Sequence, residues 1–225
     1  MNAKLILILL MLSLLAAPAL GAIGENSTEQ LAPDIVGQIN QSDRFVTPME
    51  ESLWLQMRTL LLEQVFWTRI TMTSIIQGSE DKGPVLNRLM RNYEDMTEAL
   101  APYLGNETAN KFGDLMDKHL QITVDLITAA NDNNQTAYEA ANKSLFESAN
   151  NIAAFENATI PKLAIEENDN LWRGYADLTI NEATELIDGN YSASIDTLDV
   201  IEEQAALIAD SLTNGIIQQY PEMFH

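Results

Sequence analysis

The chain has 225 residues, with 33 acidic and 12 basic side chains, a formal net charge of −21 at pH 7 and no cysteine. This charge repels nucleic acid and anionic lipid, whose binding depends on clustered lysine and arginine, so we expect no nucleic-acid partner. The lack of cysteine excludes disulfides, iron–sulfur clusters and cysteine-ligated zinc, so packing must hold the fold together.

Residues 1–22 have the pattern of a signal peptide. Lys4 precedes the apolar run Leu5–Leu15, and small residues fill most of the segment that follows, as export machinery and its peptidase require. An uncleaved membrane anchor is the alternative, because apolar residues continue toward the roughly 20 that a membrane helix needs. Pro18 favours cleavage. We therefore expect a secreted or cell-surface protein that contacts a membrane only if this segment is retained.

Residues 23–47 are polar, contain Pro33 and Gly37, and show no clear period. We interpret them as a flexible polar arm. From Pro48 onward apolar residues recur at helical spacing, so we expect residues 48–225 to form one helical-bundle domain. A chain of this length is sufficient for one sizeable core.

The apolar period after Pro48 predicts up to six helices, separated by short polar clusters, and no strand. The expected helices are Glu50–Gln77, Pro84–Leu100, Phe112–Ala130, Tyr138–Phe155, Leu171–Ile187 and Ile195–Gln219. The first is apolar on most sides, which is typical of a helix in the middle of a bundle. Long helices with short turns predict an all-α, up-and-down antiparallel bundle of four to six helices.

Two of the expected hairpins resemble each other. The turns at 131–134 and 188–190 are rich in Asn and Asp, and each is followed by a Ser or Thr at a helix start, Thr136 and Ser192. The two hairpins are about 56–57 residues apart. This spacing indicates a duplicated hairpin, which we treat as a hypothesis.

Residues suited to catalysis are scarce. The only histidines are His119 and the terminal His225. His119 lies on an apolar stripe, which favours a buried, hydrogen-bonded imidazole over a ligand. A di-iron bundle would need Glu-x-x-His pairs, but residue 116 is Met. No phosphate loop, nucleophile elbow or EF-hand loop occurs. We expect no catalytic site, no metal and no cofactor.

Several polar residues fall on apolar helix faces, where charges must be paired if they are buried. They are Arg69, Asn87, Arg88, Asn92, Asp95, His119, Asp210 and Asn214. We expect Arg69 or Arg88 to pair with Asp95 or Asp210. Such a network more often sets helix register than performs chemistry, and a ligand pocket is the alternative.

The chain contains seven Asn-x-Ser/Thr acceptor sequences for N-linked glycans, none with proline in the middle position. They begin at Asn26, Asn40, Asn106, Asn134, Asn142, Asn157 and Asn190. Most lie at expected helix ends or turns, where a glycan can project. The sequence therefore predicts a glycosylated surface.

A set of short motifs is shared with a known group of sequences. The motifs are Trp67-Thr68-Arg69, Val85-x-Asn87-Arg88-Leu89 with Asn92 and Asp95, Pro102-Tyr103-x-Gly105, His119-Leu120 and Ala209-Asp210-x-Leu212-x-x-Gly215-Ile216. From Trp67 to its end the chain resembles an uncharacterised family of small helical-bundle proteins from bacteria and archaea. The resemblance implies a helical domain and no particular activity, although some members carry enzyme labels.

The same resemblance places a histidine on each of the last two helices in the family pattern, at positions occupied here by Ala176 and Gln204. Only His119 of that set is present, so a three-histidine site is impossible in this chain. We therefore expect an exported acidic domain that binds a small molecule or a cell-envelope protein. The alternative is a structural cell-envelope glycoprotein.

Overall fold

The computed structural model describes residues 46–225. The expected signal peptide, nearly all of the polar arm and the acceptor asparagines Asn26 and Asn40 lie outside these residues. Within them the protein is all-helical, as predicted. The helices are α2 (Pro48–Gln77), α3 (Lys82–Leu104), α4 (Asn106–Asn131), α5 (Gln135–Thr159), α6 (Ile165–Ile187) and α7 (Tyr191–Gln219), followed by the short 3-10 helix η1 (Pro221–Phe224).

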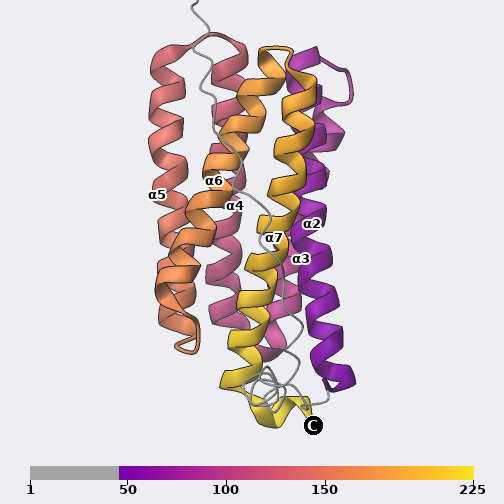
Figure 1. Ribbon diagram of the computed structural model, residues 1–225, viewed down its shortest axis with the longest axis vertical. Helices are drawn as coiled ribbons and strands as arrows, with labels where there is room; N and C mark the ends of the chain where they lie inside the picture. The colour runs from indigo at the N-terminus through magenta and orange to yellow at the C-terminus, as the bar shows by residue number, and fades with distance from the viewer. Residues whose placement is uncertain (1–45) are drawn as a thin grey trace, which may run out of the picture. The chain divides into compact units, whose positions relative to one another are not determined.

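The six helices run alternately up and down the bundle and close into a ring (Figure 1). Each helix packs on the next along the chain, and α7 packs on α2 to complete the ring. The helices α2, α4 and α6 also contact one another across the centre. These three helices therefore surround the middle of the core, with α3, α5 and α7 between them on the outside.

The turns that follow α2, α4 and α6 have the same backbone structure. Each contains one residue with positive φ, namely Gly78 (62°), Asn133 (55°) and Gly189 (72°). The next residue along donates its N–H to the carbonyl five residues back, as in a Schellman helix end. Glycine and asparagine are the residues that adopt this left-handed conformation most readily.

The repeat continues into the helices. Thr73, Thr128 and Thr184 each donate their hydroxyl to the carbonyl four residues earlier. These threonines lie 55 and 56 residues apart, the same spacing as the three positive-φ residues. The predicted repeat of two hairpins is therefore part of a threefold repeat, α2–α3, α4–α5 and α6–α7.

Each of the six helices begins two to six residues before its predicted start, and α3 and α5 also end four residues after their predicted ends. The helix α3 continues through Pro102 to Leu104, because Pro102 and Glu98 are both exposed and the carbonyl that proline leaves unpaired faces solvent. Gly105 alone separates α3 from α4, which begins at Asn106 and not at Phe112. The helix α6 begins six residues before the predicted Leu171, at Ile165.

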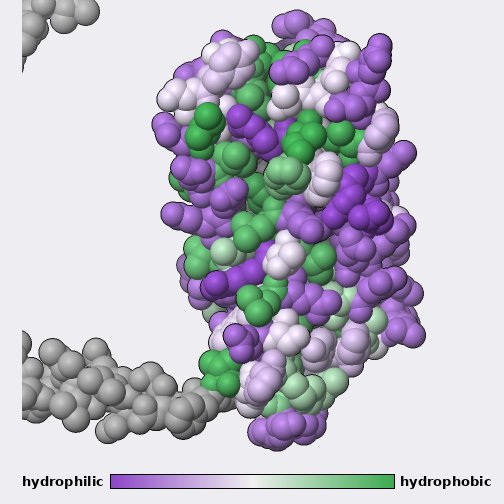
Figure 2. Space-filling model, turned by 90° about the vertical axis from the view of Figure 1, so that its right-hand side faces the viewer, coloured by the Kyte–Doolittle hydropathy of each residue, from purple (hydrophilic) through white to green (hydrophobic). Residues whose placement is uncertain are grey.

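The helix α2 is less enclosed than its composition predicted. It packs against four helices and buries one apolar stripe that includes Leu53 and Met57, but Leu55, Leu62 and Phe66 are 60%, 38% and 56% exposed. Hydrophobic side chains accordingly show among the polar ones on the face in Figure 2. An apolar composition on all sides does not place a helix at the centre when its neighbours cover only part of its circumference.

Candidate functional site

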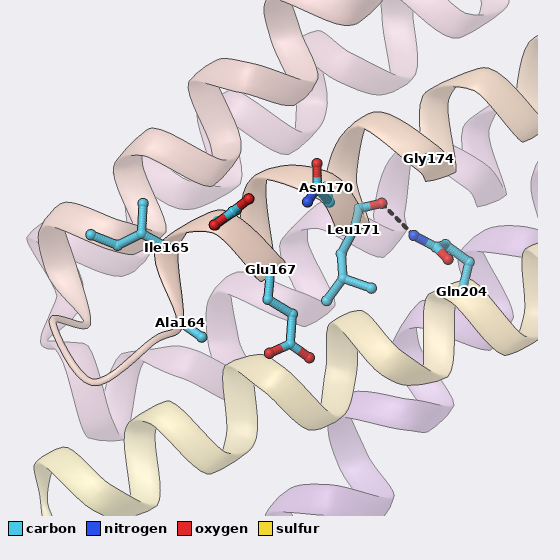
Figure 3. Close-up of a pocket in the computed structure, with 8 residues that line it drawn as sticks. Ala164, Ile165, Glu167, Asn170, Leu171, Gly174 and Gln204 are labelled. Atoms are coloured by element: carbon cyan, nitrogen blue, oxygen red, sulfur yellow. Dashed lines mark hydrogen bonds between the residues drawn. The ribbon is translucent and has the colours of Figure 1, made fainter.

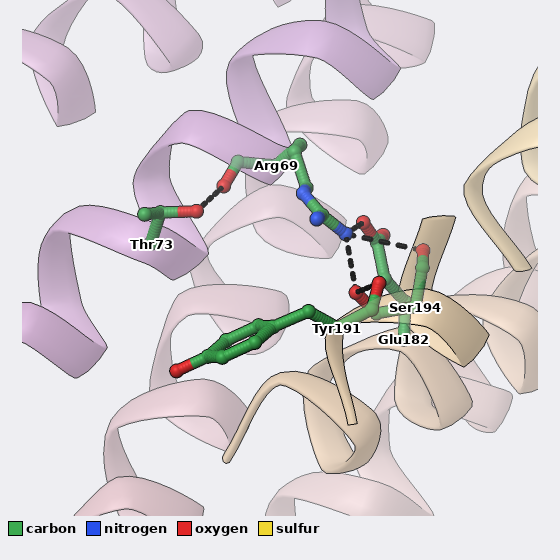
Figure 4. Close-up of polar contacts among 5 residues, drawn as sticks. All are labelled: Arg69, Thr73, Glu182, Tyr191 and Ser194. Atoms are coloured by element: carbon green, nitrogen blue, oxygen red, sulfur yellow. Dashed lines mark hydrogen bonds and ion pairs between the residues drawn. The ribbon is translucent and has the colours of Figure 1, made fainter. Parts of the chain in front are cut away.

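Arg69 joins three helices near one end of the bundle (Figure 4). From α2, its Nη1 atom donates to Glu182 Oε1 of α6 at 2.7 Å and to the carbonyl and hydroxyl oxygens of Ser194 of α7 at 3.1 and 3.2 Å. The Glu182 side chain is 2% exposed and that of Arg69 is 20% exposed. Burial raises the pKa of Glu182, and the hydrogen bond and charge of Arg69 oppose that rise.

The partners predicted for the half-buried Arg69 and Arg88 were wrong. Arg69 pairs with Glu182, and Arg88 pairs with Glu63 at 2.6 Å with its guanidinium 5.0 Å from the centre of the Trp67 ring. Neither arginine meets Asp95 or Asp210. The reason is geometric, because each arginine pairs with the acid on the helix face that packs against its own.

The other polar residues that were predicted to form a network do not contact one another. Asp210 pairs with the exposed Arg58 through an Nε–Oδ1 bond of 2.6 Å, and Asp95 lies 3.9 Å from Arg91 on the same helix. Asn92 is buried and donates to the Leu60 carbonyl at 2.9 Å. The side chains at positions 87 and 214 are exposed. The eight residues therefore do not form a single network.

His119 lies in the core and contacts a neighbouring helix, the arrangement expected from its apolar stripe. Its Nδ1 atom is 3.2 Å from Ser148 Oγ of α5, and the rings of Trp172 and Tyr175 lie 6.2 and 6.4 Å away. Burial lowers the pKa of His119 from 6.5 to about 4. The imidazole is therefore neutral at physiological pH.

Glu156 is a buried carboxyl group on α5 that was not predicted from the sequence. Its Oε2 atom accepts from Trp172 Nε1 at 2.7 Å and from Asn168 Nδ2 at 3.0 Å. Its Oε1 atom has no hydrogen-bond partner among the described residues. Burial raises the pKa of Glu156 from 4.5 to about 7, although both hydrogen bonds lower it. Its place on the buried stripe with Ile152 and Ala149 was the available signal.

A groove opens to solvent between the start of α6 and the middle of α7 (Figure 3). Its volume is about 800 Å³, and it is lined by Ala164, Ile165, Glu166, Glu167, Asn170, Leu171, Gly174 and Gln204. Gln204 Nε2 donates to the Leu171 carbonyl at 2.7 Å across the groove. We call this hollow the α6–α7 groove.

Gly174 keeps the α6–α7 groove open beside Gln204. A Cβ atom at position 174 would lie 3.0 Å from Gln204 Nε2. A second hollow of about 340 Å³ adjoins the groove and shares Ala164 and Glu167 with it. Asp210 and Asn214 line this second hollow, so two of the predicted polar residues lie beside the groove.

The groove also contains one of the two positions that the resemblance described above aligned with histidine. Gln204 lines it, whereas Ala176 is fully buried.

Among residues 46–225 no group of three or more His, Cys, Asp or Glu side chains is placed to hold a metal ion. None of the helices in this part of the chain is long and apolar enough to cross a membrane. No family model, curated protein or solved structure matches the chain.

Proposed function

We propose that the chain is an extracytoplasmic binding domain whose small-molecule ligand occupies the α6–α7 groove. The observation that carries the proposal is the groove itself, where an apolar floor at Leu171 is flanked by the polar groups of Asn170, Glu167 and Gln204. A few polar groups around an apolar surface, in a hollow of about 300–1,000 Å³, are typical of small-molecule sites.

The charges around the groove indicate the class of ligand. Among residues 46–225, Glu166 and Glu167 are the only charged residues that line the groove, and no Lys or Arg of this part of the chain lines it. An organic cation such as an amine would complement these carboxylates, whereas an anion would be repelled. The same two carboxylates stabilise the N-terminus of α6, so variants at Gly174 and Gln204 test the ligand more cleanly.

The proposal is for binding without catalysis. The buried groups with shifted pKa values are His119, Glu156, Tyr175 and Glu182. They are at most 3% exposed, and none of them lines the groove. Catalytic acids and bases need access to a substrate, which supports a binding role. The family resemblance, which implied no activity, is in keeping with this reading and stays a prediction.

Thermal unfolding with small amines tests the proposal. Short diamines, quaternary ammonium compounds and basic amino acids are added to the protein, with dicarboxylic acids as the opposite charge class. At 100 times its Kd, a ligand stabilises the folded state by about 2.7 kcal/mol. We expect at least one amine to raise Tm and no dicarboxylic acid to do so. Failure of every amine at saturating concentration would contradict the proposal.

Gly174→Ala separates binding from stability. Alanine favours the helix over glycine by about 1 kcal/mol, but its Cβ displaces the Gln204 amide and reduces the groove. We expect this variant to keep its Tm without ligand and to lose the amine-dependent rise. Gly83→Ala on α3, where a Cβ meets nothing within 4 Å, is the matched control that should bind normally. Equal binding by both variants would place the ligand elsewhere.

A structural cell-envelope glycoprotein is the second candidate. The observation that favours it is the exposure of three acceptor asparagines, Asn106, Asn134 and Asn190. In this case the acidic, glycan-bearing surface is itself the functional feature, and the partner is another envelope component. Glycopeptide analysis of the protein from its native cells tests this candidate.

A further inference from the structure

The five acceptor asparagines in the described residues occupy two kinds of environment. Asn106, Asn134 and Asn190 are exposed, whereas Asn142 and Asn157 are half-buried. We infer that the first three carry N-linked glycans in the folded protein and that the other two do not. This inference depends on export of the chain and is independent of the α6–α7 groove.

Asn134 and Asn190 are equivalent residues of two repeated hairpins, and each begins an outer helix. The Oδ1 atom of Asn134 accepts from the Ala137 N–H at 3.2 Å, and that of Asn190 accepts from the Ala193 N–H at 3.5 Å. These bonds cap α5 and α7 through oxygen. The Nδ2 atom, to which a glycan is attached, makes no hydrogen bond within the described residues in either case. Glycosylation therefore leaves both caps in place.

Asn106 is the first residue of α4 and follows Gly105, whose φ is 79°. Its side chain is exposed and makes no hydrogen bond within the described residues. A glycan at this position projects from the opposite end of the bundle to those at Asn134 and Asn190 (Figure 1). The α6–α7 groove, at the start of α6, is therefore remote from the two glycans on the repeated turns.

Asn157 is engaged through both of its amide atoms. Its Nδ2 donates to Asp169 Oδ1 at 2.9 Å, and its Oδ1 accepts from Asn168 Nδ2 at 3.2 Å. Asn168 in turn donates to the buried Glu156. A glycan on Asn157 would break the bond to Asp169 and separate the end of α5 from the start of α6.

Asn142 is excluded by its position within α5. Among residues 46–225 no partner is present for its buried Oδ1 atom, and the side chain as a whole is half-buried. A saccharide on this amide would have less room than one at an exposed turn, because it would crowd the residues packed beside it.

The modification is a saccharide transfer from a donor in which the sugar is linked to a lipid phosphate. The bond from Nδ2 to the sugar C1 forms as the bond from C1 to the phosphate oxygen breaks. Nδ2 loses one proton, and the lipid phosphate leaves with the electron pair. The third residues of the acceptor sequences at Asn134 and Asn190, Thr136 and Ser192, are exposed and available to the transferase, and that of Asn106, Thr108, is half-buried.

Mass spectrometry of intact glycopeptides from the protein's native cells tests the inference. We expect glycans on Asn106, Asn134 and Asn190 and unmodified Asn142 and Asn157. A glycan on either half-buried asparagine would overturn the inference, and so would unmodified Asn134 and Asn190. Amine binding by the same preparation reports separately on the proposed function.

Variants of the third acceptor residue keep the helix caps intact. Thr136→Ala and Ser192→Ala abolish the acceptor sequences but retain Asn134 and Asn190. Expressed in the same cells, each variant should lose one glycan mass from the intact protein. Ser144→Ala and Thr159→Ala, which alter the sequences at Asn142 and Asn157, are the matched controls and should lose none. A mass loss in the controls, or none in the first pair, would contradict the inference.

Discussion

Gln64 of α2 and Tyr175 of α6 occupy equivalent positions in two of the three hairpins, and they are joined by a buried hydrogen bond of 3.3 Å from Nε2 to the phenol oxygen. The equivalent residue of the remaining hairpin is His119, whose ring lies 6.4 Å from that of Tyr175. Each inner helix therefore contributes one polar side chain to the same part of the core. Apolar side chains of the same helices, such as Val65 and Met116, belong to the hydrophobic core.

One turn further along, each inner helix has a threonine at an equivalent position. Thr68, Thr123 and Thr179 are all buried. Thr123 and Thr179 donate to the carbonyls of His119 and Tyr175, whereas the hydroxyl of Thr68 has no partner in the part of the chain that the structure describes. The repeat thus preserves residue type at the centre of the bundle, while the individual hydrogen bonds differ.

We predict that Arg69→Ala is strongly destabilising. It leaves Glu182 buried without a cation, and breaking a buried pair in this way costs about 3 kcal/mol or more. Urea unfolding should show a clear fall in midpoint. Arg58→Ala is the control, because its pair with Asp210 is exposed and should contribute at most about 1 kcal/mol. An unchanged midpoint for Arg69→Ala would show that Glu182 does not need this partner.

We predict that Glu156→Gln abolishes the decrease in the free energy of unfolding that the ionisation of Glu156 causes in the wild type between pH 4.5 and 7. The pKa of Glu156 is 4.5 when unperturbed and about 7 in the fold, so the folded state binds the extra proton between these values. Stability from this group is therefore full below pH 4.5 and is lost as pH rises to 7. The free energy of unfolding of the variant, relative to the wild type, should increase by a few kcal/mol across this window.

The matched comparison for Glu156 is Glu147→Gln on the same helix. Glu147 is exposed, so its substitution should leave the pH profile of unfolding unchanged between pH 4.5 and 7. Urea titrations at several pH values measure both profiles. Parallel profiles for Glu156→Gln and the wild type would show that Glu156 ionises in the fold as it does in water.

For His119→Gln we predict that the free energy of unfolding, relative to the wild type, changes with pH in the opposite direction. The pKa of His119 is 6.5 when unperturbed and about 4 in the fold, so the unfolded state binds the extra proton in this window. Stability from the neutral imidazole is full above pH 6.5 and is lost as pH falls to 4. Relative to the wild type, His119→Gln should therefore gain stability as pH falls from 6.5 to 4, whatever its constant packing cost.

In the wild type the effects of Glu156 and His119 on the pH dependence of the free energy of unfolding nearly cancel. Between pH 4.5 and 6.5 one proton is bound more tightly by the fold at Glu156, and one is bound more weakly at His119. Unfolding measured for the wild type, for each single variant and for the double variant separates the two contributions. An additive double variant with opposite single slopes is the expected result. Single variants whose slopes have the same sign would contradict it.

Helix positions and the turn residues were predictable because they depend on local sequence. The apolar spacing along α2 or α7 marks a helix wherever it packs, and Asn134 and Asn190 cap helices through bonds to residues three positions away. The number of helices, their alternation and the all-α class follow from the same local signals. Burial of His119 was also predictable, since its neighbours at helical spacing are apolar.

The sequence of α2–α3 also contains the repeat, but it is harder to recognise there. Thr73, Thr128 and Thr184 occupy equivalent positions in the three hairpins. In the first hairpin, however, α3 has its N-cap at Asp81, three residues after Gly78, whereas Asn134 directly follows Asn133. The two additional residues shift α3 relative to α2, so no single spacing aligns the whole hairpin with its copies.

The sequence by itself determined which segments are helical, where the turns between them lie and which helix faces are mainly apolar, because these depend on neighbours within one or two turns. Only the tertiary structure decided that Arg69 pairs with Glu182 and that Gln204 meets Leu171 across the α6–α7 groove. Arg69 and Glu182 are 113 residues apart along the chain. With 33 acidic side chains available, charge and spacing cannot select one partner. The selection depends on which helix faces meet, and that is set by the order and rotation of the helices around the shared core.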